Sequence, residues 1–138
     1  MVIIDASVVN KLFLPNEEGQ EIASGLILRN IQKFEEIFVP DLLFYEVANT
    51  LVTKTAIPIT MVNRSLEQLD KLRLQVIHPT LEQLKKIAKF AKNHHVSVYD
   101  GTYAVLAQET GCDLITADSK FVREVNLPFV KHLTTIHL

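Results

Sequence analysis

One continuous stretch, residues 97–122, constrains the fold of this 138-residue chain more than any other. It starts with apolar residues at helical spacing and reaches Gly111, a residue type that commonly follows the end of a helix. A short apolar strand, Asp113–Thr116, comes next, and Asp118 stands where that strand should end. In parallel α/β domains, ligands bind beyond the carboxyl ends of the strands. Asp118 is therefore expected at the usual position of a binding site.

The rest of the chain continues this alternation of short strands and helices, with breakers such as Pro15 between them. Strands are predicted at residues 2–4, 37–39, 74–77, 113–116 and, at a sheet edge, 129–131. Helices are predicted at residues 6–14, 42–54, 61–72 and, from a Thr80-x-x-Gln83 capping box, to about residue 93. Another helix is expected after a cap formed by Asn16, Glu17 and Glu18. Residues expected to face inward from the helix after Thr80 are Leu84, Ile87, Ala88 and Ala91.

This alternation predicts an α/β fold, a three-layer α/β/α arrangement around a mostly parallel central sheet. The length fits one domain, residues 1–138, with a single core. No apolar run approaches the roughly 20 residues that cross a bilayer, so no membrane partner is expected. The first residues resemble a strand rather than a signal peptide, which predicts a cytoplasmic protein. A net charge of -2 leaves a nucleic-acid partner open, because phosphate binding needs only a local basic patch.

Four acidic residues stand at element ends or on a helix face: Asp5, Glu46, Asp100 and Asp118. Each has an ordinary structural explanation. Asp5 and Asp118 fit helix N-caps, Asp100 fits a capping box opened by Ser97, and Glu46 fits a solvated helix face. Together they indicate a shared acidic site, because a doubly wound sheet brings the ends of its first and late strands to one edge.

The residues around these acids read V-I-I-D-A-S, Y-E-V-A-N-T-L, V-Y-D-G-T-Y-A-V-L-A and L-I-T-A-D-S-K-F. With these motifs the chain resembles the PIN-domain family, most closely its VapC-like toxin branch, from Ile3 to about Lys131. The resemblance maps the acidic residues of the family onto Asp5, Glu46, Asp100 and Asp118. It also maps a hydroxyl residue near the first acid onto Ser7, and a T-x-D pattern onto Thr116.

The resemblance implies a divalent-metal-dependent ribonuclease that hydrolyses RNA phosphodiesters, commonly the toxin that pairs with an antitoxin protein. The chemistry of the residues agrees, because carboxylates without cysteine or spaced histidines favour Mg²⁺ or Mn²⁺ over zinc. Asp5 and Asp100 are expected as the principal ligands, with Asp118 and Glu46 completing the site directly or through water.

Other features suggest partners. The leucines of residues 61–74 exceed what a small core needs there, which suits a partner helix or a second copy and predicts a homodimer. Tyr99 and Tyr103 are candidates for stacking on a base, although Tyr103 lies on the inner side of its helix. A basic face is formed by Lys85, Lys86, Lys89 and Lys92, which fits either RNA phosphates or a solvated surface.

Three alternatives to the nuclease are consistent with a small acidic α/β domain. A receiver-type signalling module needs paired acids after the first strand, where only Asp5 stands, and gives Glu46 no role. A phosphatase with an aspartyl nucleophile needs D-x-D there, where the chain has Asp5-Ala6-Ser7. A catalytically silent PIN-type RNA-binding scaffold remains, and the presence of all four acids disfavours it.

Overall fold

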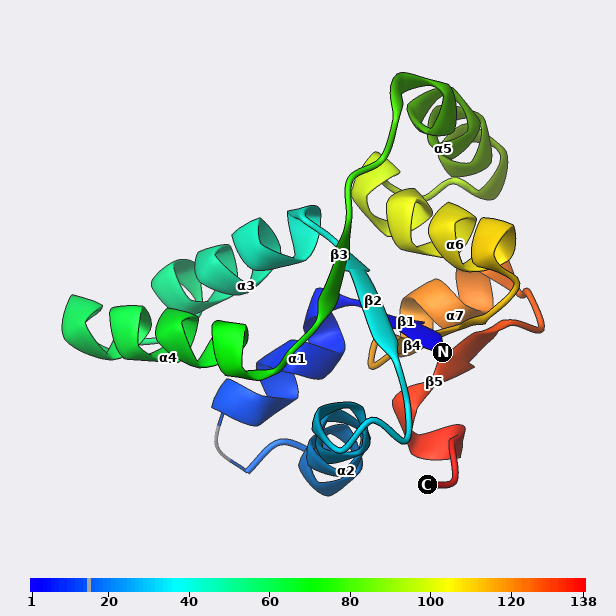
Figure 1. Ribbon diagram of the computed structural model, residues 1–138. Coiled ribbons are helices and arrows are strands. Elements are labelled where there is room, and N and C mark those ends of the chain that lie inside the picture. The colour runs from blue at the N-terminus through cyan, green and yellow to red at the C-terminus, as the bar shows by residue number, and fades with distance from the viewer. Residues whose placement is uncertain (15) are drawn as a thin grey trace.

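A five-stranded parallel sheet organises the structure, a computed structural model that describes residues 1–14 and 16–138 (Figure 1). The strands are β1 (Val2–Ile4), β2 (Ile37–Pro40), β3 (Gln75–Ile77), β4 (Asp113–Thr116) and β5 (Val130–His132), in the order β3-β2-β1-β4-β5. In the register of the central strands, Ile3 lies opposite Phe38 on one side and Leu114 on the other. All four strand pairs are parallel, so the predicted α/β fold with a parallel sheet is confirmed.

The helices flank the sheet on both faces (Figure 1). They are α1 (Ala6–Phe13), α2 (Gln20–Ile31), α3 (Leu42–Thr53), α4 (Ile59–Lys71), α5 (Leu81–His94), α6 (Val98–Thr110) and α7 (Ser119–Val125), and a short 3₁₀ helix covers Leu133–Thr135. Right-handed crossovers place α1 to α4 on one face and α5 to α7 on the other. The direction of strand addition reverses between β1 and β4, so the carboxyl ends of these neighbours form the switch point where such sheets bind ligands.

Helix α6 is the most deeply packed helix. All seven residues from Gly101 to Ala107 are buried, because the helix lies between the sheet and α5. At Gly101 an added Cβ atom would lie 3.4 Å from the Ile87 carbonyl oxygen, which is an ordinary van der Waals contact. Gly111 ends the helix as predicted, in the left-handed conformation at φ 66°.

Helix α5 packs on α6 and not on the sheet, which corrects its predicted inner face. Ile87 and Ala91 are buried as predicted, and Phe90 joins them. The prediction was wrong for Leu84 and Ala88, which are exposed. A helix that contacts only one other helix buries a narrower stripe than a helix on a sheet, so apolar spacing overestimates its core. The capping box of Thr80 and Gln83 is confirmed.

The predicted cap of α2 was also wrong. Its N-cap is Gly19 at φ 81°, with no side-chain hydrogen bond, and the chain turns at Asn16 with φ 58°. Glu17 pairs instead with Lys11 at 2.8 Å. Pro15, predicted to end the preceding helix, lies outside the described residues. Within the described ranges, no helix has the length and apolar character needed to cross a membrane.

Candidate active site

Asp5 lies at the switch point, where β1 ends and α1 begins. Its Oδ1 accepts hydrogen bonds from the backbone N–H groups of Ser7 at 3.0 Å and Val8 at 3.3 Å, so the predicted N-cap is confirmed. The N–H of Asp5 donates to the Ile115 carbonyl at 3.3 Å, which joins the end of β1 to β4. The aspartate is thereby fixed between two strand ends.

Two hydroxyls from different elements hold the Asp5 carboxylate. Ser7 Oγ donates to Oδ1 and Thr116 Oγ1 donates to Oδ2, each at 2.5 Å. The two hydroxyl oxygens lie 3.3 Å apart, and Ser7 Oγ accepts from the Ala117 N–H at 2.7 Å. Both oxygens of Asp5 are therefore oriented, one by its own helix and one by β4.

Asp118 follows β4 and caps α7, as predicted. Its Oδ1 accepts from the Phe121 N–H at 3.0 Å, and its own N–H donates to Thr116 Oγ1 at 3.0 Å. Thr116 thus connects Asp5 and Asp118 through one hydroxyl. This arrangement explains why a buried polar residue follows the apolar Leu114 and Ile115 at the end of β4.

Glu46 reaches the site from α3 and does not lie on a solvated face. It is half-buried, and its Oε2 accepts a hydrogen bond from Tyr103 Oη at 2.7 Å. Tyr103 is 1% exposed in the core of α6. The Tyr103 side chain of α6 therefore contacts Glu46 on the side of α3 that helical spacing alone assigns to water.

Asp100 lies in the first turn of α6, next to its N-cap Ser97. The Asp100 N–H donates to Ser97 Oγ at 3.0 Å, which is one half of a capping box. The reciprocal bond, from the Ser97 N–H to the Asp100 carboxylate, does not occur among the hydrogen bonds of the described residues. The predicted capping box is thus only half formed, although the Ser97 side chain still favours the ionised Asp100 carboxylate and partly offsets the rise in its pKa.

The pKa values show that these acids share one electrostatic environment. Burial raises the pKa of Asp5 to about 6, against hydrogen bonds from Ser7 and Thr116 that favour the ionised form. Burial also raises the pKa of Glu46 and of Asp100. The charges of Asp5 and Asp100 add to the rise at Glu46, and the charge of Asp118 adds to the rise at Asp100. Like charges that raise one another's pKa values favour either protonation of a carboxylate or the binding of a cation.

The structure brings the four predicted acids and both hydroxyl residues to one edge of the sheet. It does not arrange them as a ready-made ion site, since the described ranges hold no group of three acidic, histidine or cysteine side chains poised around a common point. The donors are carboxylate and hydroxyl oxygens, which suit a hard cation such as Mg²⁺ or Mn²⁺. The chemistry of the donor set therefore fits a divalent cation.

Two residues near the site were missed by sequence reasoning. Glu124 on α7 contributes charge that raises the pKa of Asp100, which makes it a fifth acid of this environment. It lies four residues after Lys120 on α7 and forms an ion pair with it at 3.7 Å. Asn10, one turn after Ser7 on α1, donates to Thr50 Oγ1 at 3.3 Å, while its buried Oδ1 has no partner in the described part of the chain. The sequence alone assigned Asn10 no role.

The fold and the site define a parallel α/β domain with an acidic edge at its switch point. The profile of the PIN domain family matches residues 2–125, so the chain belongs to the PIN-domain family. It is 28% identical over 127 residues to Ribonuclease VapC3 of Pyrobaculum aerophilum, covering 89% of this chain and 93% of that protein.

Solved structures show the same fold. The crystal structure of PAE2754 from Pyrobaculum aerophilum matches with a TM-score of 0.73 at 19% identity, covering 97% of this chain and 91% of that one. A toxin–antitoxin complex from Klebsiella pneumoniae matches with a TM-score of 0.68 at 14% identity, covering 96% of this chain and 98% of that one.

Proposed function

We propose that this chain is a divalent-metal-dependent endoribonuclease that hydrolyses RNA phosphodiester bonds, and that residues 1–138 form a single nuclease domain. The observation that carries the proposal is the convergence of Asp5, Glu46, Asp100 and Asp118 from four elements at one sheet edge. Membership of the PIN-domain family and the similarity to a protein named Ribonuclease VapC3 support it.

Asp5 and Asp100 would hold a Mg²⁺ or Mn²⁺ ion, with Glu46 and Asp118 completing its surroundings directly or through water. Such an ion supplies a nucleophile from water near neutral pH and offsets charge on a phosphodiester. Ser7 and Thr116 keep the Asp5 carboxylate in place by donating to its two oxygens. Tyr103 orients Glu46 in the same way by donating to its Oε2, so that the other carboxylate oxygen would face the ion or its water.

The elevated pKa of Asp5 gives the chain a second capacity. A carboxylate with a pKa of about 6 exchanges its proton near neutral pH, where general acid–base groups work best. With a cation bound, the ionised form is favoured instead. Asp5 is thus suited to hold a cation near neutral pH, and without a cation it becomes protonated as the pH falls through about 6.

The partners that we propose are RNA, a cognate antitoxin protein and a second copy of the chain, acting in the cytoplasm. An apolar groove of about 800 Å³ between α3, α4 and β3 supports a protein partner. From the leucine-rich segment 61–74, the half-buried Leu66 and Leu74 and the buried Leu69 line it. The structural similarity to a toxin–antitoxin complex agrees with this.

The nuclease proposal is tested by RNA cleavage with Mn²⁺, comparing the wild type with Asp100→Asn. We expect the variant to keep its fold by circular dichroism and to lose cleavage, because an amide oxygen is neutral and binds a hard dication poorly. Asp113→Asn is the matched control, since Asp113 starts β4 at the other end of the sheet and pairs with Lys131 at 2.6 Å. Cleavage by Asp100→Asn at the wild-type rate would refute the assignment. Metal-independent RNA binding without cleavage in the wild type would favour the silent scaffold.

A further inference from the structure

A small pocket adjoins the acidic site on its α3 side. It has a volume of about 380 Å³ and is lined by Leu42, Tyr45, Glu46, Asn49 and Tyr99. This volume lies at the lower end of the range of small-molecule sites, about 300–1,000 Å³. The pocket shares Glu46 with the acids, so an occupant of the pocket lies beside the candidate active site.

The pocket arises from two helix faces that Glu46 and Tyr103 hold together. On α3, Leu42, Glu46 and Asn49 follow one another at spacings of four and three, so they share a face with Tyr45 at its border. On α6, Tyr99 lies four residues before Tyr103 and therefore on the same side of the helix. The Tyr103 hydroxyl bonds to Glu46 at 2.7 Å, which brings Tyr99 opposite the α3 face.

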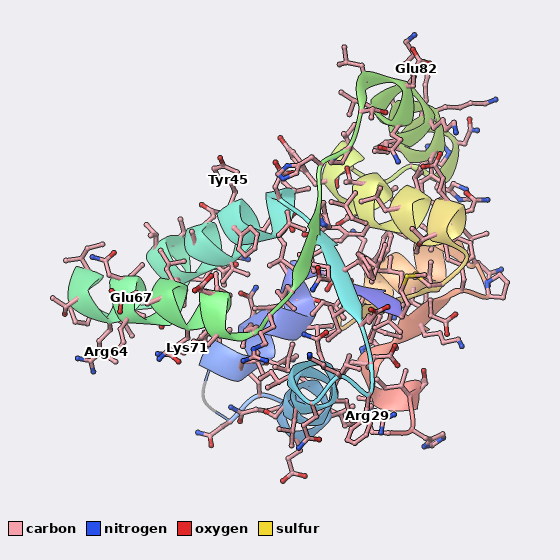
Figure 2. All side chains as sticks on the ribbon, viewed as in Figure 1. Arg29, Tyr45, Arg64, Glu67, Lys71 and Glu82 are labelled. Atoms are coloured by element: carbon pink, nitrogen blue, oxygen red, sulfur yellow. The ribbon has the colours of Figure 1, made fainter. Side chains whose placement is uncertain are left out.

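Two aromatic rings of this pocket are open to solvent. Tyr45 is 75% exposed and Tyr99 is 60% exposed, whereas the third tyrosine of the chain, Tyr103, is buried. Figure 2 shows Tyr45 projecting outward from α3. Neither exposed ring contributes to the core. Tyr45 also borders the apolar groove between α3, α4 and β3, whereas Tyr99 lines this pocket and not that groove.

The lining matches a flat, uncharged ring with a polar edge. Aromatic side chains bind single-stranded nucleic acid by stacking on unpaired bases. The Asn49 amide has both donors and an acceptor for the edge of a base. The charge of Glu46 disfavours an anionic occupant. A nucleobase meets this condition because it is neutral and its phosphate would lie outside the pocket. We propose that this pocket binds one unstacked nucleobase of the RNA, next to the bond that is cut, between Tyr45 and Tyr99. This inference rests on the proposed ribonuclease function.

Intrinsic tyrosine fluorescence provides a direct test, because the chain has three tyrosines and no tryptophan. The probe is a 12-nucleotide single-stranded RNA, titrated in EDTA so that it stays intact, together with a series in which one nucleotide at a time is abasic. We expect the RNA to quench the fluorescence of the wild type, and one abasic position to remove most of the quenching.

Substitutions then test which side chains of the pocket bind the base. Tyr99→Leu and Tyr45→Leu should each weaken RNA binding by about 5- to 150-fold, since stacking contributes about 1–3 kcal/mol per base. Tyr99→Phe keeps the ring and should bind within about twofold of the wild type, because stacking needs no hydroxyl. Phe34→Leu is the matched control, since Phe34 is an exposed aromatic side chain before β2, at the opposite edge of the sheet.

Wild-type affinity in both leucine variants would overturn the proposal. If the same variants instead change the mass measured by light scattering and leave RNA affinity unaltered, the pocket holds a second copy of the chain and not a base. Base-dependent quenching without cleavage in Mn²⁺ would refute the nuclease function alone. Cleavage that proceeds equally well in the leucine variants, with unaltered RNA affinity, would refute the base pocket alone.

Discussion

Replacing Asp5 with asparagine should make the metal-free protein more stable. Asparagine is as good an N-cap as aspartate, so its Oδ1 can keep the bonds from the Ser7 and Val8 N–H groups. Its amide nitrogen would face Thr116 Oγ1, which now donates to Asp5. The Thr116 hydroxyl can instead accept from that nitrogen and turn its proton toward Ser7 Oγ, 3.3 Å away. The variant thus loses the charge and keeps a satisfied network.

The size of the effect follows from the pKa of Asp5. A folded pKa of about 6 against an unfolded value of 3.8 means that folding disfavours the ionised carboxylate by up to about 3 kcal/mol. The folded state binds the proton more tightly, so this penalty is absent below pH 3.8 and complete above pH 6. The metal-free wild type should therefore lose stability, relative to Asp5→Asn, as the pH rises from about 4 to about 6.

Thermal unfolding in EDTA at several pH values measures this difference. At pH 7.5 we expect Asp5→Asn to melt higher than the wild type by about 3–10 °C, because the variant avoids about 1–3 kcal/mol of the penalty on the ionised carboxylate. Addition of Mn²⁺ should reverse the order, since an ion at a hundredfold excess over Kd adds about 2.7 kcal/mol to the protein that binds it.

The matched control is Asp41→Asn. Asp41 is also an N-cap aspartate, at the start of α3, and it is half exposed and pairs with His78 at 3.3 Å. Its replacement should change stability by less than about 1 kcal/mol and respond to Mn²⁺ like the wild type. If Asp5→Asn melts lower than the wild type in EDTA at pH 7.5, Asp5 is a structural cap whose charge stabilises the fold, and the reasoning fails.

Three further changes test the surroundings of the site. Tyr103→Phe removes the hydrogen bond to Glu46. In urea titrations the free energy of unfolding should fall by about 1–3 kcal/mol at pH 7.5 and by less at pH 4. An equal loss at both pH values would contradict a bond to a charged group. Asn10→Leu removes a buried oxygen that has no partner in the described ranges, together with the 3.3 Å hydrogen bond to Thr50 Oγ1. Because that bond is long, we expect a net gain in stability of up to about 1 kcal/mol, and a melting temperature below that of the wild type would contradict this balance. Gly111→Ala should lower the free energy of unfolding by about 1 kcal/mol and Gly111→Asn by less, because residue 111 has a φ of 66°. No atom lies within 4 Å of an added Cβ, so a steric clash does not contribute. Equal stability of the wild type and both variants would refute backbone strain as the cause.

The elements of this fold were predictable because their signals are local. The apolar run of β1, the Thr80 capping box and the glycine that ends α6 each depend on a few neighbouring residues, and the structure has all three. The caps formed by Asp5 and Asp118 were predictable for the same reason. The errors at the start of α2 and on the inner face of α5 arose where the outcome depends on what the helix packs against.

The details of the site depended on contacts between distant residues. Glu46 lies on the side of α3 that helical spacing assigns to water, and its partner Tyr103 comes 57 residues later. The bond from Thr116 to Asp5 joins residues 111 positions apart. No local pattern encodes such pairs. The resemblance to a family supplied the positions of these residues, and the structure supplied the hydrogen bonds that orient them.

The capping role and the proposed metal-binding role of the aspartates do not compete. In Asp118, the capping bond from the Phe121 N–H uses Oδ1, and no hydrogen bond of the described residues occupies Oδ2. In Asp5, the cap uses Oδ1, while Oδ2 accepts one hydrogen bond within the described part of the chain, from the Thr116 hydroxyl, and keeps room for a second partner. The cap fixes the direction of each carboxylate, and the remaining oxygen is held at the sheet edge. Asparagine keeps a cap and removes the charge, whereas alanine removes both, so only the asparagine variants separate the two roles.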